Sequence, residues 1–162
     1  MVNKIKVGWF SFTCCEGSTI VFVELLNTHY RLWLPKIELV YARILRKGNA
    51  EKLKEMDIAF VEGAISSNTQ EEKLKKIRQK AKILVALGSC AVLGSPSNQR
   101  NFFNPTNIEE IKPILEKFEY KEKVLKVSDV VPVDEEIPGC PMDEKKFLEL
   151  FNKLICTIPT LI

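Results

Sequence analysis

The residues best suited to chemistry in this chain are four cysteines, three of them placed just after runs of apolar residues and the fourth at the end of an extended segment. They are Cys14, Cys15, Cys90 and Cys140. The two adjacent cysteines cannot easily bond to each other, because neighbouring side chains point apart. Both thiols can reach one large ligand, such as a thiolate-bound cluster, that lies over their turn. Four convergent thiolates suit zinc or an iron–sulfur cluster.

The elements that must position these cysteines alternate along the chain. Apolar and β-branched runs predict strands at residues 5–12, 37–45, 58–61 and 83–87, with mixed strand and loop at 124–133. Helices are expected at residues 19–27, 50–56, 69–81, 108–117 and 143–155. Ser18 and Asn107 are predicted N-caps, and residues 69–72 match a capping box. A long loop is expected at residues 91–106.

This alternation predicts a single α/β domain over residues 1–162, with a peripheral apolar tail at 156–162. The natural fold is a flavodoxin-like, doubly wound and mostly parallel sheet. Ligands of such sheets bind beyond the carboxyl ends of the strands. We therefore expect the four cysteines to gather at one edge of the sheet.

The spacing of the cysteines favours a cluster over zinc. Structural zinc sites usually have two C-x₂₋₄-C pairs, which this chain lacks. An adjacent pair with two lone cysteines suits a cubane better, because its irons are spread over several ångströms. Glycines beside Cys15, Cys90 and Cys140 would let the backbone approach the sulfides, and Pro141 would exclude water. Zinc, or cysteines that are simply buried, remain as alternatives at this point.

Four segments resemble a known family. They are the cysteine turn and residues 57–63, 88–94 and 138–141. The sequence is similar there to the small, electron-transferring subunit of nickel–iron hydrogenases and to the 20 kDa-type subunit of respiratory complex I. The resemblance implies one proximal 4Fe–4S cluster bound by Cys14, Cys15, Cys90 and Cys140. It also implies a large catalytic subunit that carries the catalysis and a further electron-carrier subunit.

The chain departs from the family pattern at three places. Ser18 stands where the hydrogenase C-x-x-C turn has its second cysteine, and Cys14 is extra. The tandem pair is similar instead to the complex I-type subunit, in which both adjacent cysteines bind the cluster. Ser95 replaces a glycine of the family, and Met142 replaces a common second proline.

Two carboxylates near the cysteines have both a structural and a functional interpretation. Glu16 is either a charge at a helix N-terminus or, as similar subunits imply, a proton-transfer group. Glu62 either hydrogen-bonds the cluster loops or a partner, or simply ends a strand.

Other single residues are expected to be structural. His29 is expected to be a packed or exposed side chain, and Cys156 a buried or interface thiol. Trp9, Phe10 and Phe12 are predicted core residues. The best candidates for an exposed apolar contact are Phe102 and Phe103.

Composition limits the remaining possibilities. The chain has 162 residues, 46% of them hydrophobic and 28% charged, which is typical of a folded globular protein. A net charge of +3 is too small to indicate a nucleic-acid partner. No signal peptide and no apolar run of about 20 residues is visible. We expect a cytoplasmic protein, or one held at a membrane by partner subunits.

Two other functions compete with an electron carrier. A flavin protein would use Ser11, Thr13, Ser18 and Thr19 to bind the FMN phosphate, although FMN needs none of the cysteines. A non-redox assembly module would have a zinc-bound or metal-free cysteine site.

Overall fold

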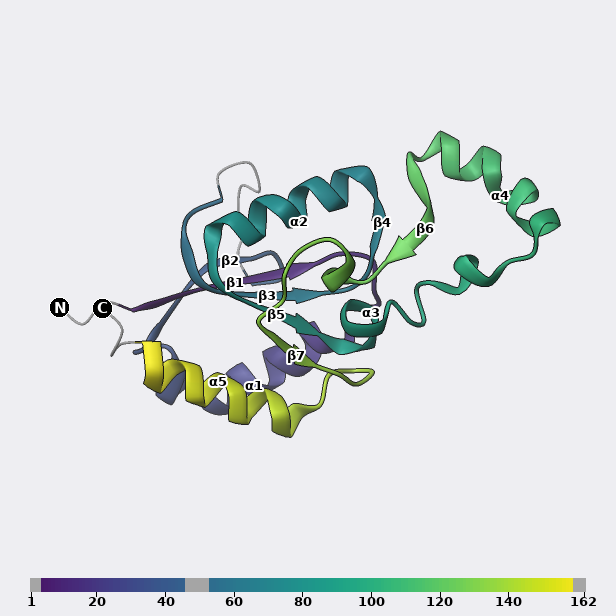
Figure 1. Cartoon of the computed structure of the whole chain (residues 1–162). Helices are drawn as coiled ribbons and strands as arrows, with labels where there is room; N and C mark the ends of the chain where they lie inside the picture. Colours follow the sequence, from purple (N-terminus) through teal and green to yellow (C-terminus); the bar gives the residue numbers. More distant parts are fainter. Residues whose placement is uncertain (1–3, 46–52, 159–162) are drawn as a thin grey trace.

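The computed structural model describes residues 4–45 and 53–158. Its central sheet has five parallel strands in the order β2-β1-β3-β5-β7 (Figure 1). The strands are β1 (Ile5–Ser11), β2 (Ile37–Ala42), β3 (Met56–Glu62), β5 (Ala81–Leu87) and β7 (Glu135–Ile137). The chain winds first to one side of β1 and then to the other, as in flavodoxin-like folds. The predicted fold class is confirmed.

Helices cover both faces of this sheet. Helices α1 (Gly17–Trp33) and α5 (Glu144–Thr157) lie on one face, and α2 (Asn68–Lys80) lies on the other (Figure 1). Strand β1 contributes side chains to the core on both faces of the sheet, because successive side chains of a strand alternate between faces. Trp9 packs in the core with α1 and α5, whereas Phe10 packs in the core with α2.

The α1/α5 side of the core is largely aromatic. Trp9 stacks on Phe22 with ring centroids 4.1 Å apart, and Phe60 and Phe147 contact it at tilted or edge angles. His29 stacks on the buried Trp33 at 4.9 Å, as expected for a packed histidine. Trp9 and Phe10 are buried as predicted, while Phe12 is only partly buried.

A second unit of structure projects from the carboxyl edge of the sheet. It contains α3 (Gly88–Leu93), the 3₁₀ turn η1 (Gln99–Phe102) and α4 (Pro105–Lys117). Strand β6 (Tyr120–Leu125) returns antiparallel to β4 (Ile65–Ser67), and a 3₁₀ turn, η2 (Val127–Asp129), follows. Figure 1 shows α4 far from the central sheet. The long loop expected at residues 91–106 therefore contains two helical segments and the start of a third.

Several predicted boundaries were wrong. Helix α1 continues through residues 29–33, and β2 stops at Ala42 instead of residue 45. Part of the helix predicted at 50–56 lies outside the described residues; residues 53–55 are not helical, and Met56 begins β3.

Helix caps also differ from the predictions. The side chain of Ser67, not Thr69, caps α2 by accepting from the backbone N–H of Gln70 at 3.2 Å. Asn104, not Asn107, caps α4. Asp143, expected to be the first residue of the last helix, is the N-cap of α5 instead.

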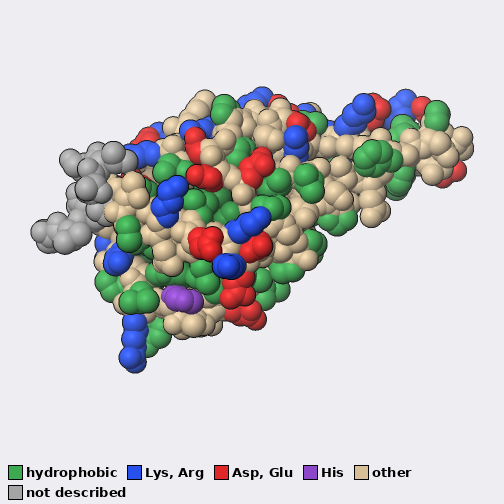
Figure 2. Space-filling view, turned by 60° about the horizontal axis from the view of Figure 1, so that its bottom comes forward, with side chains coloured by type: hydrophobic (Ala, Val, Ile, Leu, Met, Phe, Trp, Pro, Cys, Tyr) green, Lys and Arg blue, Asp and Glu red, His purple; other side chains and the backbone are tan. Residues whose placement is uncertain are grey.

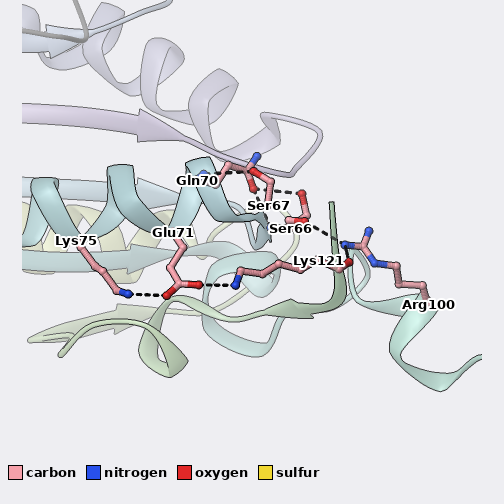
Figure 3. A network of polar contacts seen from close by, with 7 residues as sticks. All are labelled: Ser66, Ser67, Gln70, Glu71, Lys75, Arg100 and Lys121. Atoms are coloured by element: carbon pink, nitrogen blue, oxygen red, sulfur yellow. Dashed lines mark hydrogen bonds and ion pairs between the residues drawn. The ribbon is translucent and has the colours of Figure 1, made fainter. Parts of the chain in front are cut away.

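A polar network joins α2 to the projecting unit (Figure 3). Glu71 forms ion pairs with Lys75 and with Lys121 of β6, each at 2.5 Å. Arg100 donates to the backbone carbonyls of Ser66 and Lys121 at 3.2 and 2.7 Å. The segment after Cys90 is thereby fixed to the sheet edge that carries the cysteines.

Replacing Glu71 with glutamine is expected to lower the free energy of unfolding by about 1 kcal/mol or less, because exposed ion pairs contribute little. The two lysines lower the pKa of Glu71 from 4.5 to about 2. A lowered carboxyl pKa stabilises the fold above the unfolded pKa and loses that effect as pH falls. The difference between wild type and E71Q, measured by urea unfolding, should therefore shrink below pH 4.5 and vanish near pH 2. A difference that stays constant across this range would contradict the prediction.

The molecular surface carries charges of both signs. Figure 2 shows basic and acidic side chains intermingled on the face over α1 and α5. Among residues 4–45 and 53–158, no helix combines the length and apolar character needed to cross a membrane.

Candidate metal centre

The four predicted cysteines line one depression at the carboxyl edge of the sheet. Cys14 and Cys15 follow β1, Cys90 lies in α3 directly after β5, and Cys140 follows β7. Because these strands are parallel, their carboxyl ends meet at the same edge. The rest of the lining consists of Gly17, Ser18, Glu62, Leu87, Gly88, Ser89, Gly139 and Pro141. None of the described cysteines forms a disulfide.

The turn that holds Cys14 and Cys15 is tied to the end of β3. Phe12 donates from its backbone N–H to the carbonyl of Glu62 at 2.8 Å. Thr13 and Ala64 exchange two backbone hydrogen bonds at 2.9 and 3.0 Å. Gly63, between these partners, has φ +95°, and a Cβ there would lie 2.9 Å from the backbone of Phe12. Only glycine allows the two segments to approach this closely.

The segments of Cys90 and Cys140 are joined directly to each other. The backbone N–H of Ser89 donates to the carbonyl of Gly139 at 2.7 Å. The backbone N–H of Met142 donates to Ser18 Oγ at 3.2 Å, which connects the Cys140 loop to α1. All three cysteine-bearing segments are therefore hydrogen-bonded into one rim.

The predicted N-cap of α1 is wrong. Ser18 is the second residue of the helix, and its hydroxyl accepts from Met142 instead of capping. The N-cap position belongs to Glu16, which has a left-handed φ of 61° and makes no side-chain capping bond.

The four cysteines differ in exposure, and the pKa of Cys14 departs clearly from its ordinary value. Cys14 is half-buried, as Cys90 is, while Cys15 and Cys140 are exposed. Burial raises the pKa of the Cys14 thiol to about 12, and the nearby Glu62 carboxylate adds to this rise. Metal binding at this residue must therefore displace a proton, since the thiolate is the ligand form.

Sequence reasoning did not identify Ser97 as part of the site. Its hydroxyl lies 3.1 Å from the Thr13 carbonyl and 3.3 Å from Cys90 Sγ, both of which can accept a hydrogen bond from it. Ser97 thus connects the first cysteine turn to Cys90. Ser97 lies 84 residues from Thr13 and seven from Cys90 along the chain, in the segment expected to be a loop, where no periodicity pointed to either contact.

Glu16 faces a different hollow. This hollow has a volume of about 350 Å³ and is lined by Trp9, Ser11, Glu16, Thr19, Arg43 and Ile44. Glu16 does not line the cysteine depression, although its charge contributes to the raised pKa of Cys14. A proton-transfer role for Glu16 stays a prediction.

The hydroxyls expected for an FMN phosphate all have protein partners. Ser11 and Thr19 lie 3.3 Å apart, Thr13 is bonded to Ser66 and Gln70, and Ser18 accepts from Met142. A phosphate would have to compete with these bonds.

The donor set of the depression suits a 4Fe–4S cluster, for which four cysteine thiolates are the usual ligands. Three glycines belong to the lining, and a Cβ on Gly17 would lie 3.5 Å from Cys15 Sγ. The present volume, about 20 Å³, is close to what one water molecule needs. Within the described residues, no three His, Cys, Asp or Glu side chains are grouped to hold a single metal ion.

Outside the depression, two predictions concern single residues. Cys156 is exposed on α5, which excludes a thiol buried within this chain, and its alternative interpretation as an interface thiol stays a prediction. Phe102 and Phe103 are exposed, as expected, and Phe102 exposes 81% of its surface.

Known proteins with similar sequences include subunits of hydrogenases. The chain is 30% identical to one subunit of the F420-non-reducing hydrogenase vhu of Methanocaldococcus jannaschii, over 93% of this chain and 56% of that protein. It is 29% identical to the NAD-reducing hydrogenase HoxS subunit delta of Cupriavidus necator, over 94% of this chain and 79% of the relative. The chain thus spans little more than half the length of the methanogen relative.

A solved structure has the same fold. A chain in the crystal structure of an NAD+-reducing [NiFe]-hydrogenase in the H2-reduced state superposes with a TM-score of 0.82. The likeness covers 95% of this chain and 92% of the other, at 23% identity. The family model described as NADH ubiquinone oxidoreductase, 20 Kd subunit matches residues 15–154, which include Cys15, Cys90 and Cys140. The chain therefore belongs to the family of the NADH ubiquinone oxidoreductase 20 Kd subunit.

Proposed function

We propose that this chain is an electron-transfer subunit of a multisubunit oxidoreductase and carries one 4Fe–4S cluster. Cys14, Cys15, Cys90 and Cys140 would be its ligands. The observation that carries the proposal is their placement: three separate strand ends bring four thiols to one depression. Family membership supports the same ligand chemistry.

The residues around the depression would hold the cluster and control its surroundings. When bound, the cluster supplies one-electron redox chemistry. Leu87 and Pro141 contribute apolar lining that limits water, and Ser97 donates to a ligand sulfur. Water access and hydrogen bonds to sulfur are both known to set cluster potentials. Because Cys15 and Cys140 are exposed, the cluster would lie close to the surface of this chain.

The proposed partner is a large catalytic subunit of hydrogenase or complex I type, and catalysis takes place there. The relatives are named as hydrogenase subunits, which supports a partner of this kind. Leu93, three residues after Cys90 in α3, and Phe102 in η1 are exposed apolar side chains that suit contact with another chain. One cluster spans only a short path, so a further electron-carrier subunit is part of the proposal.

The direct test is anaerobic purification and reconstitution of the chain with iron and sulfide. The expected result is about four irons and four acid-labile sulfides per chain, with an EPR signal on reduction. About one zinc without sulfide would support the assembly module instead. A yellow cofactor that fluoresces after denaturation would support the flavin protein.

Replacing Ser97 with alanine is expected to lower the reduction potential of the cluster. The substitution removes a hydrogen bond to Cys90 Sγ, and such bonds stabilise the more negative, reduced state. A redox titration followed by EPR measures the shift. The matched control is S97T, which keeps the hydroxyl and should stay near the wild-type potential. Equal potentials in S97A and wild type would contradict this role.

A further inference from the structure

Glu62 is a buried carboxylate that belongs to the lining of the cysteine depression. It ends β3 and exposes only 3% of its surface. Its oxygens lie 2.9 Å from Ser18 N, 3.1 Å from Thr19 N and 2.5 Å from Thr19 Oγ1. Both partners belong to the first turn of α1, more than forty residues earlier in the chain.

The direction of these hydrogen bonds follows from Trp9. Its indole N–H can only donate, and it donates to Thr19 Oγ1 at 2.8 Å. The hydroxyl hydrogen of Thr19 is then free to be donated, and Glu62 Oε2 at 2.5 Å is a closer acceptor than Ser11 Oγ at 3.3 Å. Every hydrogen bond of the Glu62 side chain is then one that it accepts, which is the pattern of an ionised carboxylate.

The same residue fixes the chain before and after the cysteine turn. Before the turn, the Glu62 carbonyl accepts from Phe12 N at 2.8 Å. After the turn, its side chain accepts from the N–H groups of Ser18 and Thr19. Helix α1 has no side-chain cap from its own N-cap residue, Glu16. Glu62 therefore satisfies helix donors that would otherwise lack a partner, and its charge suits the positive end of the helix.

We infer that Glu62 is a positioning residue for the proposed cluster, with two separable effects. Its side chain is long enough to hydrogen-bond the first turn of α1, which fixes the Cys14–Cys15 turn between β1 and α1. Its negative charge, fixed beside the ligands, disfavours addition of an electron and so lowers the reduction potential. This inference rests on the proposed function.

Two variants separate the effects, each in the full chain reconstituted anaerobically with iron and sulfide. Glu62→Gln keeps the length but removes the charge, so the potential should become more positive. Glu62→Asp keeps the charge but shortens the reach, so iron retained after gel filtration should fall severalfold while the potential stays closer to wild type. Circular dichroism of each apo chain reports whether it folds.

The matched control is Asp57→Asn. Asp57 is also buried in β3 and accepts from Lys6 N and Lys82 Nζ at 2.8 and 2.9 Å. It lies five residues before Glu62 in the same strand, about 17 Å away. Asp57→Asn should reduce the thermal midpoint of unfolding as much as the Glu62 variants do. It should leave the reduction potential of the cluster and the amount of bound iron unchanged.

Wild-type potential in E62Q together with wild-type iron retention in E62D would overturn the inference. A potential shift in D57N as large as that in E62Q would also overturn it. If E62Q does not fold, iron retention and potential in E62D decide the case. Failure of the proposed function is distinguishable, because the wild-type chain itself would then bind no iron and sulfide.

Discussion

Replacement of Cys90 with alanine is expected to reduce the bound iron and sulfide from about four of each to less than one per chain. Cys90 is half-buried at the start of α3, next to the segment that holds Cys140. A cubane that loses one thiolate exposes an iron to water, here on the half-buried side of the site. Iron and acid-labile sulfide assays after anaerobic reconstitution measure the loss, and the EPR signal of the reduced cluster should disappear with it.

The matched control is Cys156→Ala. Cys156 is exposed on α5 and does not line the depression. This variant should bind iron and sulfide as wild type does, which separates loss of a ligand from loss of any thiol. Full cluster content in C90A, or equal loss in both variants, would refute the ligand assignment.

The sequence was sufficient for the centre of the fold. Strands β1, β3 and β5 are continuous apolar runs, and such runs are typical of parallel strands buried on both faces. Because parallel strands share a carboxyl edge, the same runs also placed Cys14, Cys90 and their neighbours at one edge. The rule places three of the four cysteines; Cys140 follows β7, which has only three residues and was not predicted as a strand.

The caps and the projecting unit were harder to predict. Ser67 and Thr69 are both good capping residues. The extended backbone of Ser67 after β4 places the N-cap of α2 at Ser67 and not at Thr69. The β4–β6 pair joins segments more than fifty residues apart, and β4 has only three residues. So short a strand has no periodicity from which to infer a partner.

The polar contacts of the site were predicted only in part. Hydrogen bonds from Glu62 to the cluster loops were one interpretation of that residue, but its partners in the first turn of α1 depend on the assembled sheet. Ser97 reaches the Thr13 carbonyl, 84 residues away, and Cys90 Sγ from a loop that Arg100 fixes to β6. Long-range hydrogen bonds of this kind leave no pattern in the local sequence.

Replacement of Gly139 with alanine is expected to reduce the free energy of unfolding by about 2–4 kcal/mol. Gly139 has φ +117°, a conformation that residues with a Cβ rarely adopt. A Cβ there would lie 2.6 Å from the carbonyl oxygen of Pro141 and 2.9 Å from the backbone N of Asp143. Both contacts are with backbone, so the loop itself must shift. Urea unfolding of the apo chain measures this cost.

The same shift should weaken cluster binding, because Cys140 follows Gly139 directly and the Gly139 carbonyl accepts from Ser89 N at 2.7 Å. Displacement of this loop therefore disturbs the segments of both Cys90 and Cys140. Gly17→Ala is the matched control: it also lies beside the cysteines, but its Cβ would meet neighbours at 3.5 Å, an ordinary contact. G17A should lose little stability and keep most of its iron. If G139A were as stable as wild type and bound the same iron, the rigid Cys140 loop would not be needed to hold the site.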